Sequence, residues 1–211
     1  MRTPMLDVEG FILVGGASSR MGEDKSGLVL DGRTTVSRVA EVLSPLTSNL
    51  SLVGSRGGLD SSLPIVPDIN ERWGPLGGIQ AALRAGRSEF CFIVACDLPF
   101  LTSELLVQLS QLTGDTKPTP EAVVPMQSDG RAQPLCAIYQ RVPCLIATEN
   151  SIALGEHTPR AMLDKVKTRY VDFSEFAHLA GSEDFFFNLN RPEDYERAKE
   201  LVRRREDHKQ Y

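Results

Sequence analysis

Residues 14–25 read VGGASSRMGEDK, and they follow the apolar run GFILV at residues 10–14. The apolar run predicts a β-strand, and the residues after it predict a loop because they are rich in glycine and small side chains. Backbone N–H groups of such a loop can bind phosphate, while Arg20 and Lys25 neutralise its charge. A flexible glycine loop with incidental cations is the alternative.

Two common phosphate-binding motifs do not fit this stretch. A Walker A loop needs four residues between its glycines and a lysine directly after the second glycine. Here five residues separate Gly16 from Gly22, and Lys25 stands three residues after Gly22. The G-x-G-x-x-G pattern is excluded because Gly15 and Gly16 are adjacent.

The composition is that of an ordinary globular protein. The chain has 211 residues, of which 41% are hydrophobic and 24% are charged, and its net charge is -5. We expect a single domain over residues 1–211. The negative charge argues against nucleic acid or an anionic membrane as a partner. No signal peptide or membrane-spanning run is visible, so a cytoplasmic location is expected.

Cysteine and histidine do not form a recognisable metal site. The cysteines are Cys91, Cys96, Cys136 and Cys144, and the histidines are His157, His178 and His208. No C-x-x-C pair occurs, and the cysteines lie in or beside apolar runs, so we expect buried free thiols. The histidines are too scattered to predict a zinc site.

Strands and helices alternate along the predicted chain. Strands are expected at residues 10–16, 49–53, 64–67, 90–96, 122–126, 134–139, 169–173 and 185–187, and the glycine-rich loop is expected to run to about residue 32. Helices are expected at about residues 35–44, 76–85, 103–112, 143–153, 159–165 and 192–207. This order predicts an α/β three-layer sandwich around a mostly parallel sheet. Residues 90–96 are apolar throughout and are therefore expected at its centre.

The stretch at residues 13–25 resembles the L-x-G-G-x-S-x-R-M-G-x-D-K signature of the molybdenum cofactor guanylyltransferases. Further segments resemble that family in the same order: VPD at 66–68, GPLGGI at 74–79, CDLPF at 96–100, QPL at 133–135 and NLNRPED at 188–194. The resemblance covers nearly the whole chain. It implies a Rossmann-like sandwich of the nucleotidyltransferase type.

Asp97 follows the predicted central strand. The carboxyl ends of parallel strands form the edge where ligands bind, and one carboxylate with phosphate oxygens and water is a common Mg²⁺ arrangement. A helix-capping role before Pro99 is the alternative from the residues alone. The resemblance implies that Asp97 binds both Mg²⁺ and the nucleotide.

The resemblance also implies roles for other residues. The implied nucleotide-binding residues are Leu13, Val14, Gly15, Gly16, Lys25, Asp68 and Asp97, and the implied catalytic residues are Arg20, Lys25 and Asp97. Asn188 and Asn190 are two residues apart, hence on one face if the segment is extended, and they are expected to bind the pterin or its phosphate; turn formation before Pro192 is the alternative. Gly77 and Gly78 allow either close approach of a ligand or tight packing of a helix on the sheet. The aromatic residues 185–187 are expected in the core.

The implied reaction joins GTP to molybdenum-bound molybdopterin, giving the guanine dinucleotide cofactor and pyrophosphate. The N-terminal half would bind the nucleotide and the C-terminal half the pterin. A phosphate monoester is largely dianionic at neutral pH, so its attack needs no strong general base. Molybdenum-insertion proteins or molybdoenzyme chaperones are the protein partners that the resemblance implies.

Other functions stay open at this point. A sister enzyme could use CTP on the same pterin, or the acceptor could be a sugar phosphate. A non-catalytic protein could deliver the cofactor, although it would not need the metal-binding Asp97. Val14, where the family usually has Ala, and Ser26-Gly27, where it has more apolar residues, depart from the family pattern. Val53-Gly54-Ser55 occupies a region where some members have Asn, which affects the prediction of guanine selection.

Overall fold

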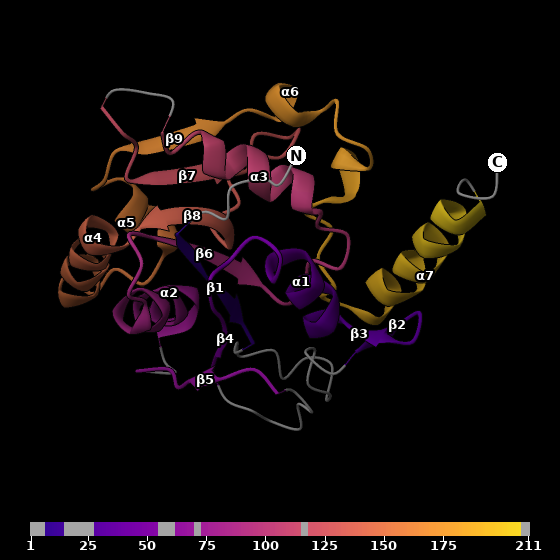
Figure 1. Cartoon of the computed structure of the whole chain (residues 1–211), viewed down its shortest axis with the longest axis horizontal. Helices are drawn as coiled ribbons and strands as arrows, with labels where there is room; N and C mark the ends of the chain where they lie inside the picture. The colour runs from indigo at the N-terminus through magenta and orange to yellow at the C-terminus, as the bar shows by residue number, and fades with distance from the viewer. Residues whose placement is uncertain (1–6, 15–27, 55–61, 70–72, 115–117, 208–211) are drawn as a thin grey trace.

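The computed structural model describes residues 7–14, 28–54, 62–69, 73–114 and 118–207. Within these residues a seven-stranded sheet has the strand order β5-β4-β1-β6-β8-β7-β9 (Figure 1). The strands are β1 (Val8–Leu13), β4 (Leu50–Val53), β5 (Ile65–Val66), β6 (Phe90–Ala95), β7 (Ala122–Pro125), β8 (Cys136–Gln140) and β9 (Thr168–Val171). β1 pairs in parallel with β4 and β6, and β4 with β5, whereas β8 runs antiparallel to β6 and β7. β7 and β9 are parallel.

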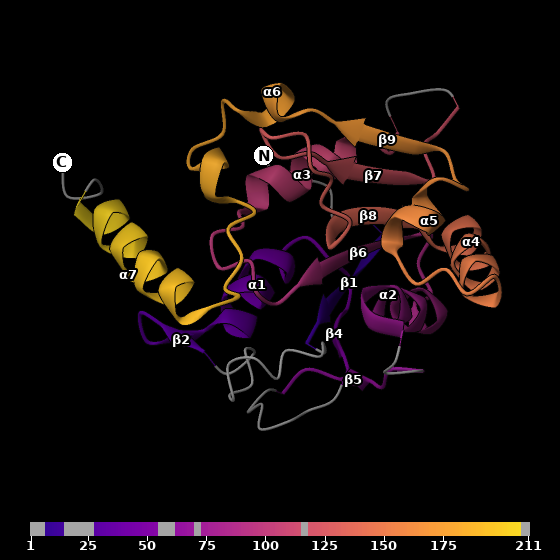
Figure 2. The same cartoon turned by 180° about the vertical axis from the view of Figure 1, so that it is seen from behind.

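Helices cover both faces of this sheet (Figures 1 and 2). The helices are α1 (Thr35–Leu43), α2 (Gly74–Ala85), α3 (Ser103–Gln111), α4 (Arg141–Ala153), α5 (Pro159–Leu163), α6 (Phe173–Phe176) and α7 (Pro192–Asp207). Side chains of α1, α3 and α6 share one hydrophobic cluster with the sheet. Side chains of α2, α4 and α5 form the cluster on the other face. The predicted three-layer α/β sandwich with a mostly parallel sheet is confirmed.

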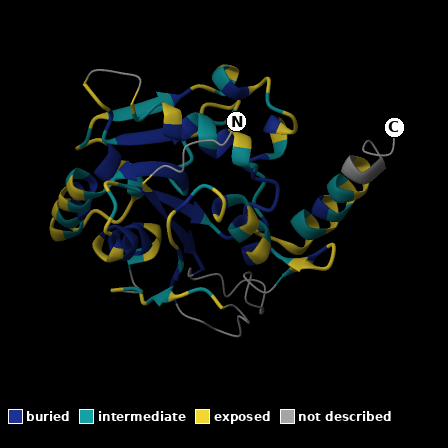
Figure 3. Ribbon diagram, in the orientation of Figure 1, coloured by how far each residue is buried: buried dark blue, intermediate teal, exposed yellow. Residues whose placement is uncertain are grey.

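The central strands show why the sequence predicted them well. All six residues of β1 are buried, and β6 is buried at Cys91, Phe92, Ile93 and Val94 (Figure 3). Neighbouring side chains of β6 enter opposite clusters, since Phe92 packs in one and Ile93 in the other. A strand covered on both faces is typically a near-continuous apolar run, as residues 90–96 are.

The predicted strand at residues 185–187 is wrong. The short helix η3 (Ser182–Asp184) precedes a turn there, and the described chain forms no strand at these three phenylalanines. Phe185 and Phe186 pack around Phe176 of α6, while Phe187 meets Phe100 edge-on in a separate cluster. A turn lets the consecutive rings of Phe185 and Phe186 enter the same cluster, whereas a strand would point them to opposite faces. The prediction that these rings belong to the core is confirmed for Phe185 and Phe186, while Phe187 is only partly buried.

A β-ribbon at residues 29–34 was not predicted. β2 (Val29–Leu30) and β3 (Arg33–Thr34) are antiparallel and are joined by Asp31 and Gly32, both with positive φ. Asp followed by Gly suits this tight turn. The glycine-rich loop therefore ends before residue 29 instead of at residue 32. Thr34 then caps the start of α1, because its side-chain oxygen accepts a hydrogen bond from the Ser37 amide at 3.1 Å.

The C-terminal helix α7 runs beside this ribbon and away from the sheet (Figure 1). The Tyr195 hydroxyl donates a hydrogen bond to the Val29 carbonyl oxygen. Leu30, Phe100, Leu189 and Ala198 form a small buried cluster between these parts. Among the described residues no helix combines the length and apolar character needed to cross a membrane.

Candidate functional site

Four parallel strands end at one edge of the sheet. The Val14 amide donates to the Val53 carbonyl oxygen at 2.9 Å, and the Cys96 amide donates to the Leu13 carbonyl oxygen at 3.1 Å. These bonds extend the strand pairing of β1 with β4 and β6 to the last residues of each strand. The chain leaves β1 at Val14 toward residues 15–27, directly beside the end of β6. Ligands of α/β proteins bind outside this type of edge.

Asp97 stands at this edge, two residues after β6. Its side chain is half-buried and lines a cavity of about 300 Å³. The cavity, here called the Asp97 cavity, is lined by Pro75, Ala95, Asp97, Leu98, Gln133, Pro134, Leu135, Pro159 and Asn188. The prediction that Asp97 lies at the carboxyl edge of the sheet is confirmed.

Two amide side chains reach the Asp97 cavity from distant parts of the sequence. Gln133 precedes β8, where the Ala95 amide donates to the Leu135 carbonyl oxygen at 2.8 Å. Asn188 belongs to the segment before α7, where the Leu189 amide donates to the Asp97 carbonyl oxygen at 3.2 Å. Asn188 Nδ2 donates to the Phe186 carbonyl oxygen at 3.2 Å. The two segments therefore place neutral amides near one carboxylate.

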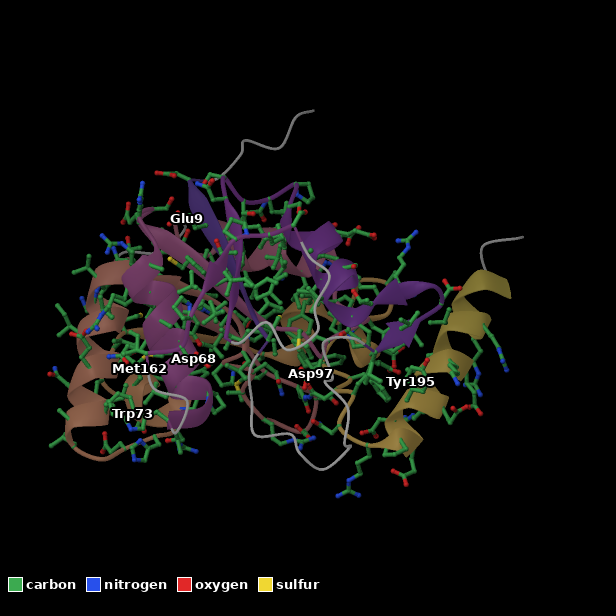
Figure 4. All side chains as sticks on the ribbon, turned by 90° about the horizontal axis from the view of Figure 1, so that it is seen from below. Glu9, Asp68, Trp73, Asp97, Met162 and Tyr195 are labelled. Carbon is green, nitrogen blue, oxygen red and sulfur yellow. The ribbon has the colours of Figure 1, made fainter. Side chains whose placement is uncertain are left out.

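Asp68 lies at the same edge but farther along it. It follows β5, and three strand spacings separate β5 from β6 in the order β5-β4-β1-β6. At about 4.8 Å a spacing, this places Asp68 roughly 14 Å from Asp97 across the end of β1. In Figure 4 both aspartates lie below Glu9, which is near the N-terminal end of β1. Asp68 does not line the Asp97 cavity.

Leu13 and Val14 have packed side chains. Leu13 is in the cluster beneath α2 and Val14 is in the cluster of the opposite face. Contact of either residue with a nucleotide would therefore use the main chain. Gly15, Gly16, Arg20 and Lys25 lie outside the described residues, so their predicted roles stay predictions.

The two glycines near the start of α2 had two interpretations, and the geometry at Gly78 favours packing. A Cβ atom at Gly78 would stand 3.3 Å from both methyl carbons of Leu13. The absence of a side chain thus lets α2 lie close to β1. Pro75, one turn earlier, lines the Asp97 cavity.

The donor set around Asp97 fits a magnesium ion. The polar side chains of the cavity are one carboxylate and two amides, whose oxygen atoms suit a hard cation. Among the described residues, no group of three or more His, Cys, Asp or Glu side chains is arranged so that it could hold a metal ion. Mg²⁺ commonly takes only one or two protein carboxylates and completes its shell with phosphate and water. Asp97 is therefore the residue that would hold the ion.

Cysteines near the centre of the sheet are not candidate nucleophiles. Burial raises the pKa of the Cys91, Cys136 and Cys144 thiols to about 12. All four cysteines are free and buried, as predicted. The nucleophilic form of cysteine is the thiolate, which these three residues do not provide at neutral pH.

Comparison with known proteins identifies the family. The MobA-like NTP transferase domain matches residues 10–170. A probable molybdenum cofactor guanylyltransferase of Pelotomaculum thermopropionicum is 34% identical over 94% of this chain and 95% of its own. The chain belongs to the MobA-like NTP transferase family. A molybdenum cofactor guanylyltransferase of Desulfosudis oleivorans is 30% identical over 93% of this chain and 96% of its own.

A solved structure agrees with this membership. Molybdopterin-guanine dinucleotide biosynthesis protein A of Archaeoglobus fulgidus superposes with a TM-score of 0.76 at 25% identity. The match covers 93% of this chain and 99% of that chain. The fold of the MobA-like NTP transferases is thus present over both halves of the sheet.

Some residues of this MobA-like site were not assigned from the sequence. Gln133 and Pro159 both line the Asp97 cavity. Gln133 lies in the QPL segment but had no predicted role, and Pro159 belongs to no recognised motif. Trp73 stacks on His157 with ring centroids 6.3 Å apart, which joins the start of α2 to the loop before α5. No local pattern predicts a contact between such distant residues. Asn190, in contrast, is exposed and does not line the Asp97 cavity.

Proposed function

We propose that the protein transfers GMP from GTP to the terminal phosphate of molybdenum-bound molybdopterin. The supporting observation is the hydrogen bond between the Cys96 amide and the Leu13 carbonyl oxygen. It joins the end of β6, which carries Asp97, to the end of β1, where the glycine-rich loop begins. A nucleotide held by that loop would present its phosphates to Asp97.

The bond changes balance without a protein nucleophile. An oxygen of the acceptor phosphate forms a bond to the α-phosphorus of GTP, and the bond from that phosphorus to the β-phosphate oxygen breaks. Pyrophosphate leaves with the electron pair. The acceptor phosphate is already largely dianionic at neutral pH, so no group must remove a proton first. This agrees with the absence of a suitable thiolate among Cys91, Cys136 and Cys144.

The proposed roles of the side chains follow from charge. Arg20 and Lys25 would neutralise the α-phosphate and the departing pyrophosphate, and Asp68 would contact the nucleotide from the far side of β1. Asp97 would hold Mg²⁺, which when bound offsets negative charge on the phosphates. Gln133 and Asn188 would orient the acceptor in the Asp97 cavity. Catalysis would then depend on position and charge.

An assay with each of the four NTPs tests the proposal. The protein is incubated with one NTP, Mg²⁺ and either molybdopterin or a sugar phosphate as the acceptor, and pyrophosphate release is followed. Release with GTP and formation of the guanine dinucleotide are expected. Release with CTP alone would support the cytidylyltransferase alternative, and release only with a sugar phosphate would support the other transferase alternative. No release with any of them would support a cofactor-delivery protein.

A binding measurement tests the loop separately. Lys25→Ala is expected to weaken GTP binding in calorimetry about tenfold or more, because a charge-assisted contact to phosphate is lost. An unchanged dissociation constant would contradict the role of Lys25. The cytoplasmic location and the protein partners expected from the sequence stay predictions.

A further inference from the structure

The two ends of the glycine-rich loop are attached to the protein in different ways. Its first end, Val14, is part of the sheet, because the Val14 amide donates to the Val53 carbonyl oxygen at 2.9 Å. Its second end, Leu28, leads directly into the β2–β3 ribbon, which lies outside the seven-stranded sheet. The position of the second end therefore depends on whatever holds the ribbon.

The ribbon is too short to hold its own position. Each of its strands has two residues, and even a longer two-stranded ribbon is only marginally stable in water. Val29 is 48% exposed, and among the four strand residues only Leu30 is buried. Contacts from neighbouring elements must therefore fix the ribbon.

Two side chains bind the carbonyl oxygens of β2. Arg38 of α1 donates to the Leu30 carbonyl oxygen from Nε at 3.1 Å and from Nη2 at 2.6 Å. Tyr195 of α7 donates its hydroxyl proton to the Val29 carbonyl oxygen. Successive carbonyl groups of a strand point to opposite edges, so the two bonds hold β2 from both sides. Arg38 follows the ribbon closely in the chain, whereas Tyr195 comes from the C-terminal helix (Figure 4).

The small buried cluster beside α7 connects the ribbon to the candidate site. It consists of Leu30 of β2, Phe100, Leu189 and Ala198 of α7. Phe100 stands three residues after Asp97, and the Leu189 amide donates to the Asp97 carbonyl oxygen at 3.2 Å. Through this cluster α7 packs on the ribbon and on both segments that surround Asp97.

Aromatic and cationic side chains fix α7 in this place. Phe187 meets Phe100 edge-on with ring centroids 5.8 Å apart, and the Arg197 guanidinium lies 5.5 Å from the Phe187 centroid. Within α7, Lys199 Nζ lies 4.4 Å from the centroid of the Tyr195 ring. Such contacts between a cation and a ring stabilise both partners. The Tyr195 hydroxyl is thus held at a defined distance from the segment that carries Asp97.

We propose that Tyr195 is a positioning residue, which holds the second end of the glycine-rich loop in place relative to Asp97 through its bond to Val29. This rests on the proposed function, because the loop is taken to bind GTP. Without the bond the ribbon is in the binding position for only part of the time, and the apparent GTP affinity falls in the same proportion. Tyr195 acts through the ribbon, since it does not line the Asp97 cavity.

Tyr195→Phe in the full-length chain tests this role. The substitution keeps the ring beside Lys199 and removes only the hydroxyl group. The dissociation constant for GTP with Mg²⁺, measured by calorimetry, is expected to rise about threefold to tenfold, as for the loss of one hydrogen bond. Tyr170→Phe is the matched control and should bind GTP as wild type does. It also removes a phenol hydroxyl, but from β9, at the edge of the sheet opposite β5.

Amide hydrogen exchange tests the effect on the ribbon without any nucleotide. The Thr35 amide donates to the Leu28 carbonyl oxygen at 3.0 Å and so reports on whether the ribbon is in place. Its exchange should be about threefold to tenfold faster in Tyr195→Phe and unchanged in Tyr170→Phe. The amides of β6 should exchange at the wild-type rate in both variants. An equal acceleration in β6 would mean that Tyr195 stabilises the whole fold, which would overturn the positioning role.

The positioning role and the proposed function fail in different ways. If wild type releases pyrophosphate from GTP with molybdopterin but Tyr195→Phe keeps the wild-type dissociation constant for GTP, the role of Tyr195 is wrong and the proposed function stands. If wild type releases no pyrophosphate, the proposed function is wrong. The role of Tyr195 in a GTP site is then wrong as well, whatever the exchange measurement gives.

Discussion

The main-chain amide of Leu189 donates a hydrogen bond to the carbonyl oxygen of Asp97 over 3.2 Å. This bond holds the segment before α7 against the end of the central strand. Leu189 is buried with Phe100 and Ala198, so its side chain anchors the same segment from the other direction. Asn188 is thereby turned into the Asp97 cavity while Asn190 is left exposed.

Asp97→Asn should remove activity and leave the fold intact. The substitution keeps the shape of a half-buried side chain but removes the negative charge that would hold Mg²⁺. Pyrophosphate release should fall about a hundredfold or more, as for loss of a preorganised electrostatic group. Glu149→Gln is the control, because Glu149 pairs with Arg84 between α2 and α4. A rate equal to that of wild type would remove Asp97 from the proposed mechanism.

Asn188→Ala and Asn190→Ala should have different effects on the KM for molybdopterin. Asn188 lines the Asp97 cavity, so its replacement should raise the KM for molybdopterin about fivefold to tenfold, in line with one lost hydrogen bond. Asn190→Ala should have a smaller effect, because Asn190 is exposed outside that cavity. Steady-state kinetics at saturating GTP measures both values. A larger effect at Asn190 would show that the segment binds its ligand in another way.

Trp73 and His157 should be energetically coupled. Their rings stack at 6.3 Å with an interplanar angle of 23° and join loops that carry Pro75 and Pro159 to the cavity. A double-mutant cycle of Trp73→Ala and His157→Ala should give a coupling of about 0.5–1.5 kcal/mol in the free energy of unfolding. Urea denaturation of the four proteins measures it. If the effects of the two single substitutions on the free energy of unfolding simply add, the contact between the two rings contributes nothing to stability.

Gly86→Ala should destabilise the protein by about 1–3 kcal/mol because of overpacking. Gly86 ends α2 with an ordinary φ of -61°, not in the left-handed conformation that is common for glycine at a helix end. A Cβ atom there would stand 2.9 Å from Cys91 Sγ and 3.3 Å from Glu9 Oε2. Gly114→Ala is the control, because its nearest neighbour would be 4.0 Å away. Equal thermal stability of the two variants would contradict this explanation.

The buried thiols should make stability fall at high pH. Burial raises the pKa of Cys136 from the ordinary 9.0 to about 12. Between these values the unfolded chain loses the thiol proton while the folded chain keeps it, so the free energy of unfolding decreases as pH rises. Denaturation at pH 7.5 and 10 in the presence of a reductant should show this decrease. Cys136→Ala should show a smaller decrease in the free energy of unfolding between these two pH values. If the variant and the wild type had the same pH dependence, the decrease could not be assigned to the Cys136 thiol.

Local patterns determined much of the fold. The apolar runs at residues 10–14 and 90–96 predicted the strands β1 and β6, and the second run was also expected at the centre of the sheet, because strands covered on both faces have near-continuous apolar runs. Asp97 and the glycine-rich stretch were both recognised because each directly follows one of these strands. Where several strands are parallel, the positions of such residues at one edge follow from topology alone.

The tertiary structure decided which other side chains accompany Asp97. Gln133 and Asn188 reach the cavity because β8 inserts beside β6 and because Leu189 bonds to Asp97. Neither pairing has a local signal, since contacts between distant segments are set by the packing of the whole sheet. The sequence likewise predicted a strand at residues 185–187, whereas the chain forms a turn there, which lets Phe185 and Phe186 enter one cluster and Phe187 another. The sequence alone thus determined the sandwich and its central carboxylate, and the packing determined the shape of the cavities around it.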